Sequence, residues 1–308
     1  MKKILRTLKW LLLLTVWWSC ETVVDFDVPR TPPKLVLNGI FEEGRPMQVH
    51  LSASRHILDK EPPPAVEGAQ VQVYAHDTLL VTLADSLEGK YMAYDLLAQR
   101  GVTYTVTAVK EGYESISATV TVPADTARVV DMQMDTVEVN EFGFTTRYPR
   151  LQIKVEDPAG QEDFYMIAVY KEGYYYEYDY TVEPPVLIDS TEYYEQMDIY
   201  TRDPGVEEYM DYGQELIFKD DLFDGRQYTF NILLTNYIND YQDFPEGNFT
   251  YRTAVAKISR GYYLYKASYE YQVWNTGNPF AQPVQVYTNV NNGYGILGGK
   301  NTVYITLD

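Results

Sequence analysis

The chain has 308 residues, of which 45% are hydrophobic and 22% charged, a composition typical of a globular protein with room for two domains. It carries 44 acidic and 25 basic side chains, which gives a formal net charge of −19. Such a charge repels phosphate groups, so the chain is not expected to bind nucleic acid or to lie flat on an anionic membrane. The single cysteine excludes an intrachain disulfide, so packed cores must stabilise the fold.

Residues 1–19 are predicted to be a lipoprotein signal peptide. A basic start is followed by an apolar run from Leu11 to Trp18, about half of the ~20 residues needed to span a bilayer. Ser19 then precedes Cys20, which we expect to be the lipid-attachment residue. Two or three acyl chains on Cys20 would anchor the protein by its end. The alternative is an ordinary signal peptide cut elsewhere, which would leave Cys20 a free thiol.

Residues 20–33 are expected to form a tether behind the anchor. The segment contains Asp25, Asp27, Pro29, Pro32 and Pro33. Prolines fix φ and remove backbone donors, and acidic residues stay hydrated, so the segment favours a semi-extended spacer.

Residues 34–124 are predicted to form a first β-sandwich domain of immunoglobulin-like or transthyretin-like size. Apolar residues alternate with polar ones in short runs, for example around Val49 and Val106. Glycines such as Gly68 and Gly101 separate the runs at intervals of about ten residues, a pattern typical of an antiparallel sandwich.

Residues 125–147 are expected to be a connector or a loosely attached strand, and residues 148–308 a second β-sandwich domain. Later strands are predicted at residues 216–219, 228–235 and 253–258. The sequence from Asp221 to Gly225 is predicted to join the first two of these as a hairpin.

The second domain is expected to carry an acidic, tyrosine-rich insert over about residues 172–212. Residues 161–224 hold eighteen acidic and three basic side chains. Tyrosines at every second position would line one face of a strand, and they offer a large, rigid contact area with a polar tip. A solvated hairpin held by cross-strand tyrosine pairs is the alternative. The predicted partner or ligand surface comprises Tyr174, Tyr176, Tyr178, Tyr180, Tyr193, Tyr194 and Tyr200.

The last part of the chain is predicted to contain a short helix and a glycine-rich loop. Apolar residues at spacings of three and four from Tyr262 to Val273 favour a helix over residues 260–273, with Ser259 as its N-cap. One face of this helix would carry Tyr262, Leu264, Tyr265, Tyr269 and Val273. The glycines from Gly293 to Gly298 match a dinucleotide fingerprint by letter, but a strand instead of a helix should follow them. We therefore expect no cofactor there and a loop in which backbones approach closely.

No catalytic constellation and no metal site are predicted. Calcium at Asp220, Asp221 and Asp224, or at Asn239, Asp240 and Asp243, is an alternative without the spacing of a known loop. The many carboxylates leave open a surface-anchored hydrolase of polysaccharide or peptide, although nothing in the sequence selects a catalytic pair.

Several segments together resemble the Bacteroidota outer-membrane lipoproteins grouped as domain of unknown function 4249. They are Cys20-Glu21 with its acidic spacer, the residues from Leu35 to Gly39, Val66 to Ala69, Asn278 to Phe280, Pro283-Val284, and Asn289 to Gly299. The resemblance covers nearly the whole chain after Cys20 but not the tyrosine-rich insert, and it supplies no catalytic residues.

The resemblance implies a non-enzymatic accessory binding subunit of a TonB-dependent receptor, acting in nutrient uptake or surface assembly. The expected location is the outer membrane, anchored by lipid. Glu21, Asp25 and Asp27, close to Cys20, favour the exterior face over the periplasmic one.

Overall fold

The computed structural model describes residues 31–307 except 57, 58, 60, 142, 236–246, 277, 279–281 and 283. The predicted signal peptide, Cys20 and most of the tether therefore lie outside the described residues. The chain divides into two compact units, Met1–Pro32 and Pro33–Asp308, and the second is described here. Within the described part of the chain, no helix is long and apolar enough to cross a membrane.

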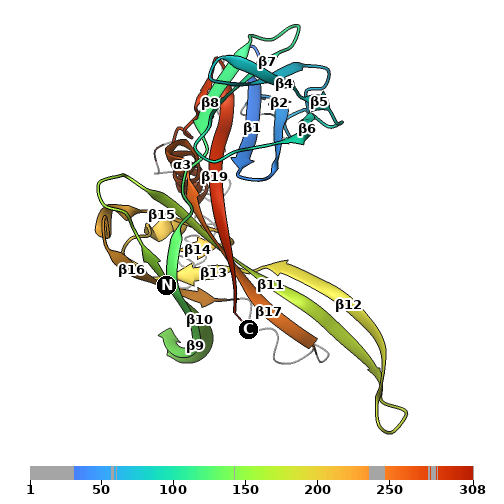
Figure 1. Ribbon diagram of the computed structural model, residues 1–308, viewed down its shortest axis with the longest axis vertical. Helices are drawn as coiled ribbons and strands as arrows, with labels where there is room; N and C mark the ends of the chain where they lie inside the picture. Colours follow the sequence, from blue (N-terminus) through green and yellow to red (C-terminus); the bar gives the residue numbers. More distant parts are fainter. Residues whose placement is uncertain are drawn as a thin grey trace, which may run out of the picture. The chain divides into compact units, whose positions relative to one another are not determined.

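The unit consists almost entirely of β-strands, which confirms the all-β prediction (Figure 1). The helical elements among the described residues are α3 (Arg260–Asn275) and the 3₁₀ turns η2 (Glu208–Met210) and η3 (Asp220–Leu222). The strands are β1 (Leu35–Glu42), β2 (Pro46–Ala53), β3 (Gln70–Ala75), β4 (Thr78–Thr82), β5 (Ala84–Asp85), β6 (Lys90–Leu97), β7 (Thr103–Val109), β8 (Ile116–Thr121), β9 (Arg128–Glu141), β10 (Phe144–Glu156), β11 (Phe164–Asp179), β12 (Val186–Gln196), β13 (Ile199–Thr201), β14 (Tyr212–Gly213), β15 (Leu216–Lys219), β16 (Gln227–Leu234), β17 (Gly247–Ile258), β18 (Val290–Asn291) and β19 (Tyr294–Leu307).

The strands form three sheets. A nine-stranded sheet has the order β12-β11-β17-β19-β1-β2-β6-β5, with β15 also paired to β11. The first five-stranded sheet has the order β18-β8-β7-β3-β4, and the second β14-β13-β16-β10-β9. Each five-stranded sheet packs its apolar face against a different part of the nine-stranded sheet, so the chain builds two sandwiches that share one long sheet.

Two hydrophobic cores lie inside these sandwiches. The first contains Leu37, Val106 and Leu297, and the second contains Ile153 and Ile167, all at 0% exposure. Leu297 belongs to the C-terminal part of the chain, where we expected only the second domain. The expected boundary between residues 34–124 and 148–308 therefore differs from the structure, because the first core needs residues from the end of the chain.

The strand responsible is β19, which passes from one sandwich to the other (Figure 1). Its first half pairs in parallel with β1, from Val36 opposite Tyr294 to Glu42 opposite Lys300. Its second half pairs antiparallel with β17, beginning with Ile258 opposite Lys300. A single strand that is hydrogen-bonded in both sandwiches makes one continuous sheet.

Residues 125–147 are mostly strand, so of the two alternatives the structure has the strand and not the connector, and the strand is paired along its length. β9 pairs antiparallel with β10 from Arg128 opposite Glu156 to Glu141 opposite Phe144. Much of β9 faces solvent, and Ala127, just before it, is the residue of this segment that is buried in the core. The strand therefore has few buried side chains, and apolar periodicity does not identify it.

The predicted hairpin between residues 216–219 and 228–235 is wrong. β15 pairs with β11 in the nine-stranded sheet, whereas β16 pairs with β10 and β13 in a five-stranded one. The connection therefore crosses between the two layers. The ring centroids of Phe218 and Phe230 lie 4.0 Å apart, and Phe223 lies 5.6 Å from Phe230, so aromatic packing holds the crossing together.

Helix α3 confirms the predicted helix and its N-cap, since the Ser259 side chain accepts a hydrogen bond from the backbone N–H of Tyr262. The predicted face divides along the helix: Tyr262 and Leu264 pack against the second core, whereas the residues of its last turns are exposed. Tyr263 is the buried residue, with its ring 4.9 Å from that of Phe164, while Tyr269 and Val273 are about half exposed. Only the first turns of the helix pack on the sheets, so the side chains of the last turns are exposed to solvent.

The predicted glycine-rich loop is instead the start of β19, although the expected close approach of backbones is present. Gly295 has a φ of +99°, and a Cβ built on it would lie 2.1 Å from the carbonyl oxygen of Leu37. Glycine is required here because the parallel neighbour β1 leaves no room for a side chain.

Candidate functional site

The candidate site is the hairpin formed by β11 and β12. The first part of β11, through Val169, is buried in the second core. β17 accompanies β11 only as far as Tyr175, which lies opposite Gly247. Beyond that point β12 is the only neighbour of β11 among the described residues, and the two strands continue as a ribbon (Figure 1). The hairpin is therefore anchored in the core at one end and exposed at the other.

One face of the hairpin base is built around Tyr170. Its ring stacks on that of Tyr194 at 5.4 Å, and the Arg252 guanidinium lies 5.8 Å from the Tyr170 centroid. Nε of Arg252 also lies 3.1 Å from a carboxylate oxygen of Glu172. Burial raises the pKa of Tyr170 to about 12, so its hydroxyl stays protonated at neutral pH. Tyr194, 57% exposed, and Tyr174, 47% exposed, extend this face toward solvent.

The opposite face carries a second aromatic cluster. The rings of Tyr175, Tyr193 and Phe249 lie 4.7 to 5.6 Å apart, mostly edge to face. The Lys171 ammonium lies 4.5 Å from the Phe249 centroid, within cation–π range. The hydroxyl of Tyr193 donates to Glu195, and burial together with this carboxylate raises the pKa of Tyr193. This cluster fixes the hairpin to β17.

The tip of the hairpin is apolar and exposed. Val186, Leu187 and Ile188 are 53%, 48% and 58% exposed, and Tyr180 is 68% exposed. Asp179 supports the turn by accepting hydrogen bonds from the N–H and the hydroxyl of Thr181, which lowers the pKa of that carboxyl. Contiguous exposed apolar side chains of this kind mark interaction surfaces.

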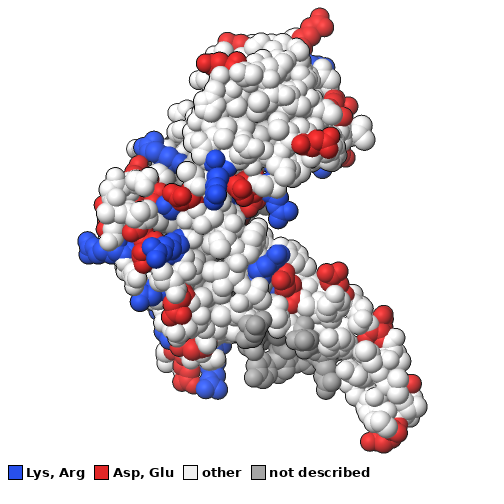
Figure 2. Space-filling model, in the orientation of Figure 1, with Lys and Arg blue, Asp and Glu red and all other residues white. Residues whose placement is uncertain are grey.

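The hairpin is uniformly acidic. In Figure 2 the charged side chains over its distal part, on the face drawn, are all acidic. Between positions 172 and 196 the charged side chains are Glu172, Glu177, Asp179, Glu183, Asp189, Glu192 and Glu195. No basic side chain occurs in that stretch of sequence, and only Glu172, at the base, is paired with the Arg252 side chain of β17, so the ribbon beyond its base carries a negative field.

The structure places most of the predicted surface on this hairpin. Tyr174, Tyr176 and Tyr178 lie on β11, Tyr180 in the turn, and Tyr193 and Tyr194 on opposite faces of β12. A register shift between Glu177 and Tyr178 interrupts the regular ladder. Tyr200 lies elsewhere, on β13 in a different sheet, where its hydroxyl accepts a hydrogen bond from Arg202.

Sequence reasoning missed the residues that hold the hairpin and its apolar tip. Phe249 and Arg252 come from β17, about seventy positions further along the chain, and only the fold brings them here. The sequence does contain an indication of the tip, because Val186, Leu187 and Ile188 directly follow two prolines and lie between acidic residues. An apolar triplet next to a turn could have been identified as exposed.

The outer backbone edge of β12 can be assigned from one hydrogen bond. The N–H of Met197 donates to the carbonyl of Val169 at 2.8 Å, so these opposite residues form a hydrogen-bonded pair. Such pairs alternate along an antiparallel ladder. By the observed register, the amides of Tyr193 and Thr191 face β11, whereas those of Ser190, Glu192 and Tyr194 face outward.

A second candidate is a cluster of carboxylates at the end of the second sandwich. Asp157, Asp220 and Asp224 each bring an oxygen within 4.8 Å of the others, and the first two are buried. Burial raises the pKa of Asp220. Asp221 of the suggested calcium set pairs instead with Lys219, and Asn239, Asp240 and Asp243 lie outside the described residues.

Backbone and hydroxyl donors already satisfy this cluster. Asp157 accepts from the Tyr165 hydroxyl and from the N–H of Gly225, Asp220 from the N–H of Asp163, and Asp224 from the N–H of Gly160. The oxygens are of the kind that calcium prefers. The burial of Asp157 and Asp220, 4% and 3% exposed, leaves little access for a polymer substrate.

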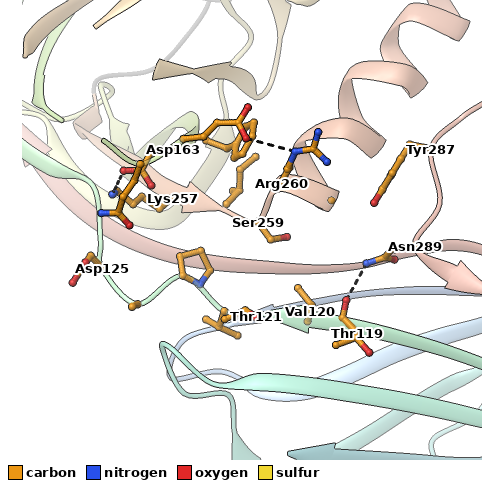
Figure 3. A pocket seen from close by; sticks show the side chains of 18 residues that line it. Thr119, Val120, Thr121, Asp125, Asp163, Lys257, Ser259, Arg260, Tyr287 and Asn289 are labelled. Atoms are coloured by element: carbon orange, nitrogen blue, oxygen red, sulfur yellow. Dashed lines mark hydrogen bonds and ion pairs between the residues drawn. The ribbon is translucent and has the colours of Figure 1, made fainter. Parts of the chain in front are cut away.

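A pocket of about 500 Å³ lies between the end of β8 and the start of α3 (Figure 3). Its basic side chains are already paired: Lys257 Nζ lies 2.5 Å from Asp163, and Arg260 Nε lies 3.6 Å from Glu162. The hydroxyl of Ser259 accepts from the N–H of Gly299 at 3.0 Å and caps the helix. The pocket lining mixes polar side chains with apolar ones such as Val122, Phe164 and Ile258, and it selects no particular ligand.

Comparison with protein families finds a match to the model described as Domain of unknown function (DUF4249), over residues 21–305. A comparison with curated proteins finds no match.

Proposed function

The chain belongs to the family described as Domain of unknown function (DUF4249), and from this we propose that it is a non-enzymatic outer-membrane lipoprotein that binds a partner protein through the β11–β12 hairpin. The expected partner is a TonB-dependent outer-membrane receptor, for which the chain would act as an accessory subunit in nutrient uptake or surface assembly. Cys20 would carry the lipid anchor, on the exterior face of the membrane.

The observation that carries this proposal is the exposed hairpin. Its base is fixed by aromatic clusters on both faces, and its tip presents Val186, Leu187 and Ile188 to solvent. A rigid projection with exposed apolar and tyrosine side chains has the composition of the buried centre of a protein interface. Burial of these side chains by a partner would remove an unfavourable contact with water.

The test is a pull-down of the full-length protein, tagged at its C-terminus, from native membranes in mild detergent. The variant replaces residues 176–190 by Asn-Gly, which leaves Tyr175 and Thr191 as the hydrogen-bonded pair that closes a two-residue turn. We expect the wild type to recover an outer-membrane receptor near one-to-one and the shortened variant to lose it.

A matched control replaces Tyr94 by serine, because Tyr94 is 67% exposed in the other sandwich. Recovery of the receptor should survive this change. Undiminished recovery by the hairpin-shortened variant would contradict the proposal.

Two further measurements address the anchor and the chemistry. Mass spectrometry of the mature N-terminus should find acyl chains on Cys20, and protease treatment of intact cells should cleave the protein if it faces outward.

The alternative is a carboxylate-dependent surface hydrolase. Turnover of glycans or peptides by the purified protein, lost in an Asp224→Asn variant, would replace the binding function by that one.

A further inference from the structure

We propose that the outer edge of β12 accepts a basic, extended segment of a partner protein as an additional strand of the nine-stranded sheet. The inference rests on the proposed function, and it adds the mode of binding and the chemistry of the partner. Its basis is the combination of a backbone edge without a neighbouring strand, an excess of acidic side chains and exposed anchor side chains on one strand.

No described strand pairs with the outer backbone edge of β12, and this edge is long enough to accept one. β12 is the last strand of its sheet, and its eleven residues pair only with β11 among the described residues. The N–H and C=O groups of Glu192 and Tyr194 face outward, whereas the outward N–H of Ser190 already donates to Oδ1 of Asp189 at 2.8 Å. A partner strand laid along this edge could form a ladder of backbone hydrogen bonds, as in strand-addition recognition.

The edge lacks most of the features that proteins use to protect exposed strands. Edge strands are usually short, or carry Lys, Pro or a pronounced bulge that prevents pairing. β12 has the sequence VLIDSTEYYEQ, with no proline or lysine, and every residue from Val186 to Glu192 is exposed. The register shift near Ile188 leaves the stretch from Asp189 to Gln196 regular.

Charge determines which segment can pair. The hairpin carries seven acidic and no basic side chains between positions 172 and 196. A second copy of β12 would place like charges directly opposite each other, which destabilises a strand pair. A segment in which Lys or Arg alternates with apolar residues would place its cations on the face that carries Glu192 and Glu172, and its apolar side chains on the opposite face near Thr191 and Tyr193.

The same charges disfavour a lipid surface as the occupant. Asp179, Glu183 and Asp189 flank the apolar tip, so insertion into an anionic membrane would bring carboxylates against like-charged head groups. Vesicle binding is therefore the competing outcome of the test.

The first experiment measures binding of two synthetic probes to the purified protein after Cys20→Ser substitution. One probe is an eight-residue peptide of alternating Lys and Val, and the other alternates Glu and Val. Backbone amide exchange is followed by NMR. We expect the basic peptide to protect the outward amides of Glu192 and Tyr194, and to leave the already bonded amides of Thr191 and Tyr193 unchanged.

Paired substitutions separate the backbone edge from the charge. Ser190→Pro removes an outward N–H and blocks the approach of a strand, and should weaken the basic peptide about tenfold, whereas Ser190→Ala should leave binding unchanged. Glu192→Lys should weaken the basic peptide more than Glu192→Gln does. Thermal unfolding and the shifts of the inward amides verify that each variant keeps its hairpin.

The outcomes distinguish this inference from the proposed function. If the shortened hairpin loses the receptor but Ser190→Pro retains it, the hairpin binds through its faces or tip and the strand-addition inference is overturned. Equal weakening by Ser190→Ala and Ser190→Pro, or equal affinity for both peptides, overturns it as well. Binding to phosphatidylglycerol vesicles in preference to the basic peptide would assign the tip to lipid.

Discussion

Gly295 lies opposite Leu37 in the parallel pairing of β19 with β1, and a Cβ on Gly295 would come within 2.1 Å of the Leu37 carbonyl oxygen. This contact lies where β19 enters the first sandwich. The close packing of two backbones there sets the position of the strand that joins the two cores.

The first prediction is that Gly295→Ala strongly destabilises the protein. The substitution adds backbone strain at a φ of +99° to a clash with a main-chain oxygen that cannot move aside, so we expect a loss of more than about 3 kcal/mol. Urea unfolding followed by circular dichroism measures it. Gly112→Ala is the control, because Gly112 has a φ of +86° but no atom within 4 Å of its Cβ position, and should cost about 1 kcal/mol. If the two substitutions lower the free energy of unfolding equally, the contact with the Leu37 carbonyl oxygen contributes nothing to the effect of Gly295→Ala.

The second prediction concerns the buried ion pair of Lys257 and Asp163, whose side chains are 8% and 16% exposed. Lys257→Met leaves the Asp163 carboxylate buried without its cation, so we expect a loss of about 3–5 kcal/mol in the free energy of unfolding. Adding Asp163→Asn should recover part of that loss, and a double-mutant cycle measures the coupling. Lys219→Met, in an exposed pair with Asp221, should cost less than about 1 kcal/mol.

The third prediction is a pH dependence that arises from Asp220. Burial raises its pKa above the ordinary value of 3.8, so the folded state holds this proton more tightly than the unfolded state does. The resulting stability is complete below about pH 3.8 and is lost as pH rises through the folded-state pKa. Asp220→Asn should therefore increase stability over the wild type at pH 7 and leave it nearly unchanged at pH 3.5.

Unfolding measured between pH 3.5 and 7 tests this sign. Asp221→Asn, at the exposed neighbouring position, should shift the stability by less than about 0.5 kcal/mol throughout. A wild type that gains stability over Asp220→Asn as pH rises would contradict the assignment. Such a gain only in the presence of calcium would instead identify Asp157, Asp220 and Asp224 as a cation site.

The fourth prediction is that Phe249→Ala loosens the hairpin without unfolding the cores. Phe249 contacts Tyr175, Tyr193 and Lys171, so its removal takes away the cluster that attaches β12 to β17. We expect hydrogen-exchange protection of the inward amides of β12 to fall, and the unfolding of the cores to change little. Tyr174→Ala, on the opposite and exposed face, should leave this protection intact. Loss of protection in β16 as well would mean that the hairpin and the second core unfold together.

Local chemistry determined a good part of this protein. The alternation around Val49 and Val106 placed strands correctly, and Ser259 before an apolar spacing of three and four placed α3 and its N-cap. These features depend on contacts between residues that are close in sequence, so a pattern of a few residues is enough to predict them. The tyrosine periodicity likewise identified the hairpin strand from Tyr174 to Tyr178.

Long-range register decided the rest. β15 and β16 are close in sequence but enter different sheets, Tyr200 lies away from the other predicted tyrosines, and Leu297 completes a core whose first member is Leu35. Asp157 joins Asp220 and Asp224 only because the ends of β10 and β15 meet. The energy of such contacts comes from pairing and burial between segments distant in sequence. Periodicity shows which face of a strand is apolar, and only the tertiary structure determines which apolar face it meets.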